Sequence, residues 1–271
     1  MNDRTTQAAA FHMLHQNPAH PLLLANAWDV ASARLVESAG APAIATTSAG
    51  VAWSLGHADG NALGREEAIA ALARIASAVT VPVTADIEAG YADDADGVEQ
   101  TVDAVLEAGA VGINIEDGAL PPAELIARIG AARRTADRAG VPMFINARTD
   151  VYLAGLVTPE QRLVETLHRA HRYLEAGADG VFVPGVSDAD TIRALAEAIN
   201  GPLNVMVGPG SPNTAQLSEL GVARVSVGSG MAQAAYEIAR SAATELLTAG
   251  TYGPLAPAVA YGELNSLFSR G

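Results

Sequence analysis

Two acidic side chains, Asp86 and Glu88, stand at the end of an apolar segment and could bind a metal ion. Apolar residues around them predict a buried strand over residues 81–88, which Gly90 then ends. Because side chains alternate along a strand, Asp86 and Glu88 project from the same face. Carboxylates held this way suit a hard divalent cation, Mg²⁺ or Mn²⁺. The simpler alternative is a pair of solvated acids in a turn.

Composition narrows the class of protein. The chain has 271 residues, of which 49% are hydrophobic and only 17% charged, so we expect a sizeable core rather than disorder. The chain has no run of eighteen apolar residues, so we expect no membrane-spanning helix, and the N-terminus shows no secretory signal. The sequence contains no cysteine, which excludes disulfides, thiolate metal sites and a cysteine nucleophile. These features together favour a cytoplasmic protein.

The chain is strongly acidic. Its net charge is −14, with 30 acidic residues against 16 Lys and Arg. This balance disfavours nucleic acid and anionic membranes as partners. An anionic substrate would therefore need a local cation in its pocket.

A strand followed by a helix recurs eight times along the chain. We expect strands at residues 22–26, 43–47, 81–88, 111–116, 142–148, 180–183, 203–207 and 224–227, and helices at 30–39, 65–78, 94–108, 122–139, 159–176, 188–199, 214–220 and 231–248. Apolar strands that alternate with helices form parallel sheets, and eight units predict a single α/β domain over residues 1–271, a (β/α)₈ TIM-type barrel. A doubly wound sheet is the alternative, but no Gly-x-Gly-x-x-Gly follows the first strand.

The two ends of the chain lie outside this repeat. We interpret residues 1–20 as a short helix or arm at a solvated terminus, since His12, His15 and His20 are spaced too irregularly for a metal site. Residues 250–271 form an apolar C-terminal extension. We expect it to pack on its own barrel or on a partner subunit.

Polar residues gather at the carboxyl ends of the predicted strands, the reactive face of such barrels. The second strand ends in a stretch that contains Thr46, Ser48, Ala49 and Gly50, and the next loop contains His57 and Asp59. The fourth strand carries Asn114 and Glu116, and the fifth carries Asn146 and Arg148. Since Mg²⁺ keeps several waters, we expect Asp86 to bind it directly, and Asp59, Glu88 and Glu116 to bind through water.

Arg148 is the candidate cation for a substrate carboxylate, which a guanidinium can bind in bidentate fashion. The structural alternative is a salt bridge from Arg148 to Glu116 or Asp150. Backbone N–H groups of residues 48–50 could form a nest for a second carboxylate, although a plain turn would look the same.

Other polar and aromatic residues at this rim leave two interpretations open. Asn114 and Asn146 fit a hydrogen-bonded barrel interior as well as they fit substrate contact. Tyr91 could cover the metal or simply pack at the barrel mouth. We interpret Trp28 and Trp53 as packing residues.

These motifs resemble those of the isocitrate lyase/phosphoenolpyruvate mutase superfamily. The resemblance rests on Ser48-Ala49-Gly50, on Asp86-Ile87-Glu88-Ala89-Gly90-Tyr91, on Gly112-Ile113-Asn114-Ile115-Glu116-Asp117 and on Asn146-Ala147-Arg148-Thr149-Asp150. It implies a helix-swapped barrel that forms a homodimer or homotetramer through its C-terminal helix, and a bound Mg²⁺ anchored by Asp86. It also implies that Asp59, Glu88 and Glu116 are water-mediated ligands, that Arg148 holds the substrate, and that the reaction breaks or forms a C–C or P–C bond next to a 2-oxo acid.

The sequence departs from lyases of this superfamily after the fourth strand. Their Lys-x-Cys-Gly-His loop is replaced by Gly118-Ala119-Leu120-Pro121-Pro122, so the cysteine that serves as acid or base is missing. We therefore expect a metal-dependent C–C lyase or decarboxylase that acts on a small 2-oxo or 2-hydroxy carboxylate through an enolate. Tyr91, His57 or water are the candidate proton donors. A phosphonopyruvate or phosphoenolpyruvate-type mutase or hydrolase, and a non-catalytic 2-oxo acid binding protein, are the alternatives.

Overall fold

The computed structural model describes residues 4–17, 19–60 and 62–269. Within these residues, nine parallel strands form one sheet in the order β1-β9-β8-β7-β6-β5-β4-β3-β2. The strands β1 (Leu22–Leu24) and β2 (Asn26–Ala27) are consecutive parts of one segment. Because β1 pairs with β9 and β2 with β3, this segment closes the sheet into a barrel. The predicted (β/α)₈ fold is confirmed, with the first strand interrupted at Ala25.

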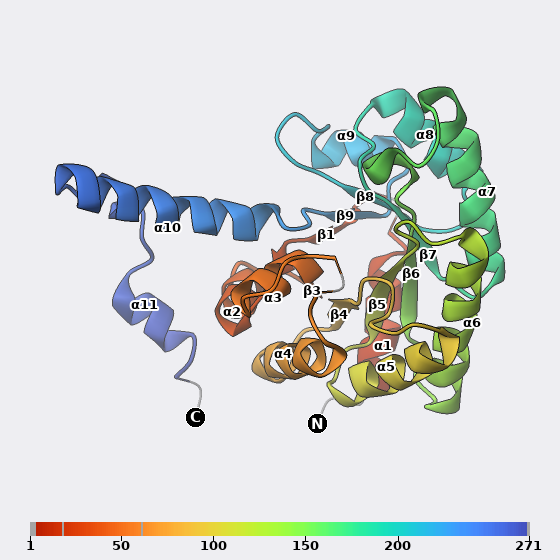
Figure 1. The fold of residues 1–271 in the computed structure, drawn as a ribbon, viewed down its shortest axis with the longest axis horizontal. Helices are drawn as coiled ribbons and strands as arrows, with labels where there is room; N and C mark the ends of the chain where they lie inside the picture. The colour runs from red at the N-terminus through yellow and green to blue at the C-terminus, as the bar shows by residue number, and fades with distance from the viewer. Residues whose placement is uncertain (1–3, 18, 61, 270–271) are drawn as a thin grey trace.

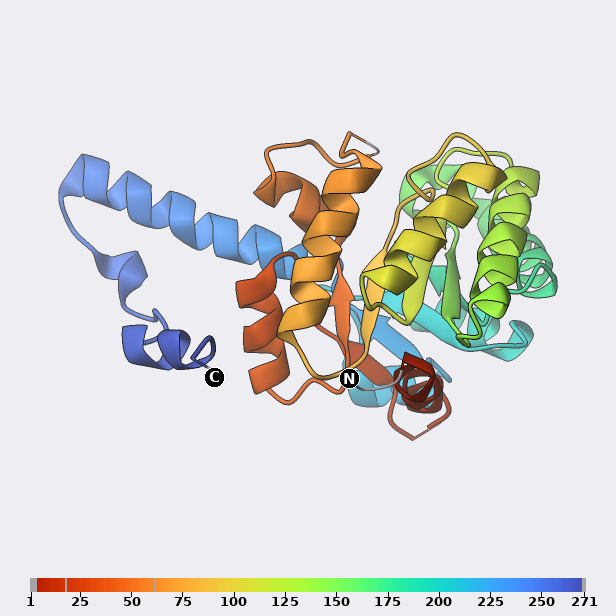
Figure 2. The ribbon, with the colours of Figure 1, turned by 90° about the horizontal axis from the view of Figure 1, so that it is seen from below.

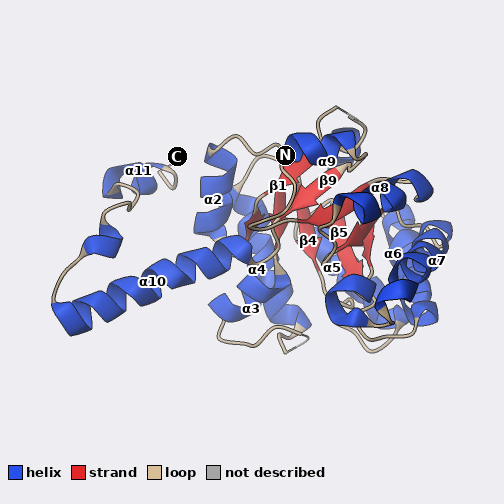
Figure 3. Ribbon diagram, turned by 90° about the horizontal axis from the view of Figure 1, so that it is seen from above, coloured by secondary structure: helices blue, strands red, loops and turns tan. Residues whose placement is uncertain are grey.

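The remaining strands are short apolar runs inside a ring of helices (Figure 3). They are β3 (Ile44–Thr46), β4 (Val83–Asp86), β5 (Gly112–Glu116), β6 (Phe144–Arg148), β7 (Gly180–Val183), β8 (Leu203–Met206) and β9 (Arg224–Ser226). Nearly all of their residues are buried, because helices cover the outer face and side chains fill the interior.

The helices begin and end where local chemistry dictates. They are α1 (Arg4–Leu14), α2 (Val30–Ser38), α3 (Ser48–Ser54), α4 (Arg65–Ala78), α5 (Ala95–Glu107), α6 (Pro122–Arg138), α7 (Arg162–Glu175), α8 (Ala189–Ala198), α9 (Thr214–Glu219), α10 (Gly230–Ala249) and α11 (Tyr261–Ser266), with short turns of helix at η1 (Val151–Gly155), η2 (Pro159–Gln161) and η3 (Gly253–Leu255). Asp29 starts α2 through a capping box with Ser32, as its position before Val30 predicts.

Helix α1 closes the amino-terminal end of the barrel, so the expectation of a solvated terminus is wrong. Phe11 is fully buried, and the ring of His15 stacks on Phe144 at 3.8 Å with only 6% of the residue exposed. Gly112 makes room for this packing, since a Cβ there would lie 2.7 Å from the ring of Phe11. A barrel end without a cover would leave apolar strand residues in water, and α1 supplies the cover.

Helix α10 projects away from the barrel, and the chain then turns back through η3 and α11 (Figures 1 and 2). The returning tail touches the barrel at α2, where the guanidinium of Arg34 donates to the carbonyl of Leu267 at 2.6 and 3.0 Å. Large apolar side chains along this projection nevertheless remain exposed, among them Leu247 at 83% and Tyr261 at 84%. Within the described residues, no helix combines the length and the apolar character that crossing a bilayer requires.

Candidate active site

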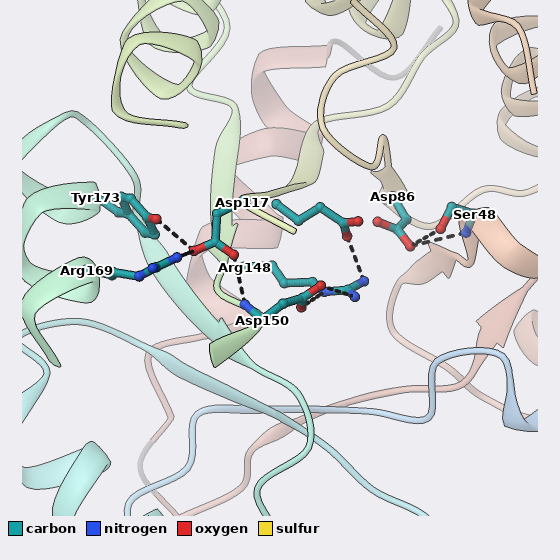
Figure 4. A network of polar contacts seen from close by, with 8 residues as sticks. Ser48, Asp86, Asp117, Arg148, Asp150, Arg169 and Tyr173 are labelled. Atoms are coloured by element: carbon teal, nitrogen blue, oxygen red, sulfur yellow. Dashed lines mark hydrogen bonds and ion pairs between the residues drawn. The ribbon is translucent and has the colours of Figure 1, made fainter. Parts of the chain in front are cut away.

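The register of three adjacent strands brings the predicted acids and the arginine together. Asp86 of β4 pairs with Asn114 of β5, and Glu116 of β5 pairs with Arg148 of β6. All of these strands are parallel, so Asp86, Glu116 and Arg148 meet at the carboxyl-terminal rim of the barrel. Figure 4 shows Asp86 and Arg148 at this rim.

Asp86 is held by groups from β3 and α3 through one of its two oxygens. The backbone N–H and the hydroxyl of Ser48 both donate to Oδ2 of Asp86, at 3.1 and 2.8 Å. The backbone N–H of Asp86 donates to the hydroxyl of Thr46 at 2.9 Å. The other oxygen, Oδ1, is buried and has no hydrogen-bond partner among the described residues. The aspartate is thus fixed in place with one oxygen available to a cation.

The segment after β3 is a short helix rather than the predicted turn. Residues 48–50 form the first turn of α3, where backbone N–H groups have no intrahelical acceptor. Gly50 lies so close to Trp28 and Thr47 that a Cβ would come within 2.8 Å of both side chains. The predicted backbone donors are therefore present, but the start of a helix presents them. Trp28 and Trp53 both pack near the ring of Tyr236 from α10, as predicted for packing residues.

The guanidinium of Arg148 is shared between two carboxylates. Its Nε and Nη2 donate to the two oxygens of Asp150 at 2.7 and 2.9 Å, and Nη1 forms an ion pair with Glu116 at 2.7 Å (Figure 4). Burial by itself would lower the pKa of Arg148, but Glu116 and Asp150 together raise that pKa above its usual range. The arginine stays charged, and the salt bridges weighed as an alternative role are both present.

Burial also changes the acid that faces Arg148. It raises the pKa of Glu116 well above its usual range; the charge of Arg148 opposes this effect, while Asp86, Asp150 and Glu88 reinforce it. Negative charge is therefore crowded at this rim in the absence of a further cation.

The turn after β4 is strained at two residues. Glu88 and Tyr91 adopt left-handed backbone conformations with φ of 51° and 48°. The carbonyl of Glu88 accepts the backbone N–H of Glu116 at 2.9 Å, and the Glu88 side chain is buried. Burial, together with the charges of Glu88, Asp86, Glu116 and Asp59, raises the pKa of Tyr91. These acids therefore surround a phenol that stays protonated at neutral pH.

The residues at this rim fit a hard divalent ion. The donor set consists of carboxylate oxygens, and Asp86 has a buried oxygen that no protein group satisfies. Among the described residues, no three His, Cys, Asp or Glu side chains are close enough to ligate one ion directly. Asp86 combines a fixed position with an oxygen that could contact such an ion.

Three further candidates lie in different surroundings. His57 is partly exposed, with its Nε2 3.5 Å from Glu67 of α4, and Asp59 is exposed in the same loop. Asn114 is 5% exposed, and its side-chain oxygen accepts from Asn146 at 2.9 Å and from Arg224 at 3.0 Å. The two asparagines form a hydrogen-bonded layer inside the barrel, one of the two roles weighed for them.

A cavity of about 700 Å³ opens next to the rim and is large enough for a small carboxylic acid, but neither Asp86 nor Arg148 is among its lining residues. Its lining includes Glu116 and Tyr91, and residues 117–120 of the loop after β5 form one wall. This loop, residues 117–121, contains all of the segment that replaces the lyase motif except Pro122, which begins α6.

Two groups of buried polar residues were not predicted from the sequence. Asp117 is fully buried and accepts hydrogen bonds from Arg169 and Tyr173 of α7. The two donors stand four residues apart, an ordinary helical spacing that does not single them out in the sequence. Arg224 is fully buried in β9, and no carboxylate lies within ion-pair distance of it in the described part of the chain. Burial lowers the pKa of Arg224 to about 9, with Asp86 opposing the shift. The only signal for Arg224 was a charged residue inside an apolar strand.

Fold and site together define a (β/α)₈ barrel with an acid-and-arginine site at the carboxyl ends of its strands. A family model described as phosphoenolpyruvate phosphomutase matches residues 11–247. The chain therefore belongs to this family, within the isocitrate lyase/phosphoenolpyruvate mutase superfamily, as its motifs predicted.

Similar proteins with other descriptions cover different shares of the chain. An uncharacterized protein of Mycobacterium tuberculosis is 41% identical over 224 residues, which are 81% of this chain and 82% of that protein. The 2-methylisocitrate lyase of Escherichia coli is 28% identical over 68% of this chain and 64% of the lyase. An oxaloacetate decarboxylase of Pseudomonas entomophila is 33% identical over 55% of this chain and 53% of the decarboxylase. A crystal structure from Burkholderia cenocepacia, provisionally assigned as a lyase/mutase, is 36% identical with a TM-score of 0.90, over 98% of this chain and 97% of that chain.

Proposed function

We propose that this protein is a Mg²⁺- or Mn²⁺-dependent C–C lyase or decarboxylase that acts on a small 2-oxo or 2-hydroxy carboxylate. The observation that supports this most is that two groups lie on nearby strands: Asp86, which has a buried oxygen without a hydrogen-bond partner, and the charged Arg148. The similarity to a 2-methylisocitrate lyase and an oxaloacetate decarboxylase supports the same class of reaction.

Arg148 binds the substrate carboxylate in this proposal. Asp150 holds the Nε and Nη2 side of the guanidinium, so the Nη1 side that faces Glu116 is the one a substrate would share. Ser48 fixes the position of Asp86, and the first N–H groups of α3 offer additional donors. A divalent ion bound at Asp86 would supply Lewis-acid polarisation of the substrate oxygens.

The missing cysteine limits which bonds the site can cleave. Decarboxylation or retro-aldol cleavage leaves the electron pair of the broken C–C bond in an enolate, which then needs one proton. In a retro-aldol cleavage the substrate hydroxyl also loses its proton as it becomes a carbonyl, and water can take up this proton. The protonated phenol of Tyr91 is the candidate donor that lies among the site acids, and water is the alternative. His57 is a weaker candidate because its ring is paired with Glu67.

A steady-state assay tests this function directly. Purified protein would be offered oxaloacetate, 2-methylisocitrate and 2,3-dimethylmalate, each with Mg²⁺ and with EDTA. We expect turnover of at least one acid, reduced by about 10³-fold without metal, because Lewis-acid stabilisation amounts to several kcal/mol. The proposal fails if none of these acids shows metal-dependent turnover.

The family description gives a second candidate, a phosphonopyruvate or phosphoenolpyruvate mutase or hydrolase. Phosphorus-31 NMR of a reaction with phosphonopyruvate distinguishes this activity, because the phosphorus resonance moves when the P–C bond breaks. Binding of oxalate or pyruvate without turnover of any acid would instead favour a 2-oxo acid binding protein.

A further inference from the structure

Asp117 borders the cavity and is the most completely hydrogen-bonded carboxylate near the site. It is fully buried behind the rim. Its Oδ2 accepts from the guanidinium of Arg169 at 3.0 Å and from the hydroxyl of Tyr173 at 2.8 Å, both from α7. Its Oδ1 accepts the backbone N–H of Asp150 at 2.9 Å. The carboxylate therefore ties α7 to the backbone just after β6.

The same contacts continue to Arg148 (Figure 4). The backbone N–H of Asp117 donates to the carbonyl of Arg148 at 3.2 Å. The side chain of Asp117 accepts the backbone N–H of Asp150, two residues further along the chain. Asp150 in turn grips Arg148 with both of its oxygens. Side chain and backbone of Asp117 thus fix both ends of the segment Arg148-Thr149-Asp150.

We propose that Asp117 is a positioning residue that sets the direction of the Arg148 guanidinium. A free arginine side chain loses rotamer entropy when it binds a ligand, and a side chain that is already held in place avoids this cost. Asp150 can hold Arg148 only where its own backbone is fixed, and Asp117 with its α7 donors fixes it. This inference rests on the proposed function, since it assigns Arg148 to substrate carboxylate binding.

A purely structural role for Asp117 would predict lost stability and nothing else, and the chain offers a matched control for this. Asp179 accepts the backbone N–H of Ile145 at 2.8 Å and pairs with Arg133 of α6. Its contacts are similar in kind, a helix arginine and a backbone N–H, but they lie at the start of β6, at the opposite end from Arg148. The Asp179 side chain is 25% exposed, whereas that of Asp117 is fully buried.

The experiment compares Asp117→Asn with Asp179→Asn in thermal unfolding and in steady-state kinetics on the acid that the wild type turns over. We expect both variants to lose stability. In the proposed function Arg148 contacts the substrate carboxylate equally in the ground state and in the transition state. A misplaced Arg148 would therefore weaken both contacts and raise KM. We expect Asp117→Asn to raise KM at least tenfold with a smaller change in kcat, and Asp179→Asn to change KM less than twofold. Tyr173→Phe, which removes one donor, is expected to give an intermediate KM.

Crystal structures of the two variants provide a readout that does not depend on activity. We expect the pairing of Arg148 with Asp150 to be displaced in Asp117→Asn and intact in Asp179→Asn. An unchanged Arg148 in the Asp117→Asn structure, or equal KM values for the two variants, would overturn the inference. If the wild type turns over no acid, the proposed function fails while the crystal structures still decide the role of Asp117.

Discussion

At the scale of single residues, each polar side chain of the rim is held by a partner that is itself fixed. Ser48 holds Asp86 through its N–H and its hydroxyl, and Asp150 holds Arg148 through two hydrogen bonds. The chain has a net charge of −14, and the guanidinium of Arg148 lies among acids that keep it charged. The local cation that an anionic substrate requires is therefore present in advance.

His15 makes the stability of the protein sensitive to acid. Its Nδ1 donates to the carbonyl of Phe11 at 2.9 Å, which fixes the neutral ring, and its Nε2 is buried without a partner among the described residues. Burial and then the charge of Arg224 lower the pKa of His15 from 6.5 to about 3. Between these two values the unfolded chain binds a proton that the folded chain does not, so stability falls as the pH falls from 6.5 towards 3.

We expect this histidine alone to remove about 1 kcal/mol of unfolding free energy between pH 7.5 and 5.5. Urea unfolding at both values would show the loss in the wild type and a smaller loss in His15→Gln. The exposed His168 serves as the control, because His168→Gln should lose as much as the wild type. Equal pH dependence of the wild type and His15→Gln would contradict this assignment.

Sequence predicted the rim residues but not the residues that support them. Acids and an arginine at alternate positions near the ends of apolar strands must meet once those strands are parallel and adjacent, which is how Asp86, Glu116 and Arg148 were found. The partners Arg169 and Tyr173 belong to a helix whose pattern gives no reason to single them out. Their contact with Asp117 depends on how α7 packs on β6, and local periodicity does not contain that information.

At the scale of elements, capping residues and glycines defined most boundaries correctly. Asp29 caps α2 through its side chain, as predicted. Asp94 and Asp188, predicted as the first residues of their helices, instead cap α5 and α8. Helix α3 was missed because its first turn contains Gly50, a weak helix former, and Ser48, a residue type common in turns. Its hydrogen bond to Asp86 and its packing against Trp28 are tertiary contacts that override this local preference.

Helix α10 and the tail after it expose more apolar surface than a stable monomer usually does. Exposed side chains include Tyr236, Ile238, Leu246, Leu247 and Tyr261. We propose that this projecting segment packs against a second copy of the chain, giving the homodimer or homotetramer that the superfamily resemblance implies. Burying large apolar side chains contributes about 1.5–3 kcal/mol each, so a few of them can hold subunits together.

Sedimentation analysis of a charged variant tests this assembly. Ile238→Glu with Leu247→Glu should weaken association by at least 100-fold, because two apolar contacts become buried charges. Val164→Glu is the control, since Val164 is 71% exposed on α7, outside the projecting segment, and its replacement should leave the assembly unchanged. A wild type that sediments as a monomer at all concentrations would show the proposal to be wrong.

At the scale of the whole molecule, the barrel assembles a site from residues far apart in the sequence. Thr46 and Asp150 are joined through β3, β4, β5 and β6, which follow one another in the sheet in chain order. This arrangement could be predicted because the strand–helix unit repeats eight times and parallel connections leave few topologies. The course of α10 away from the barrel was implied only by the superfamily resemblance, because the apolar residues of the helix do not themselves specify whether the partner surface lies in the same chain or in another.

We propose that a divalent ion anchored by Asp86 and the guanidinium of Arg148 jointly bind a 2-oxo acid. Titration of Mn²⁺ followed by electron paramagnetic resonance, with and without oxalate, tests it most directly. We expect oxalate to tighten Mn²⁺ binding by the wild type at least tenfold, and Asp86→Asn to abolish both the Mn²⁺ binding and its enhancement by oxalate. Mn²⁺ binding by Asp86→Asn equal to that of the wild type, or oxalate binding that is indifferent to metal, would contradict the claim.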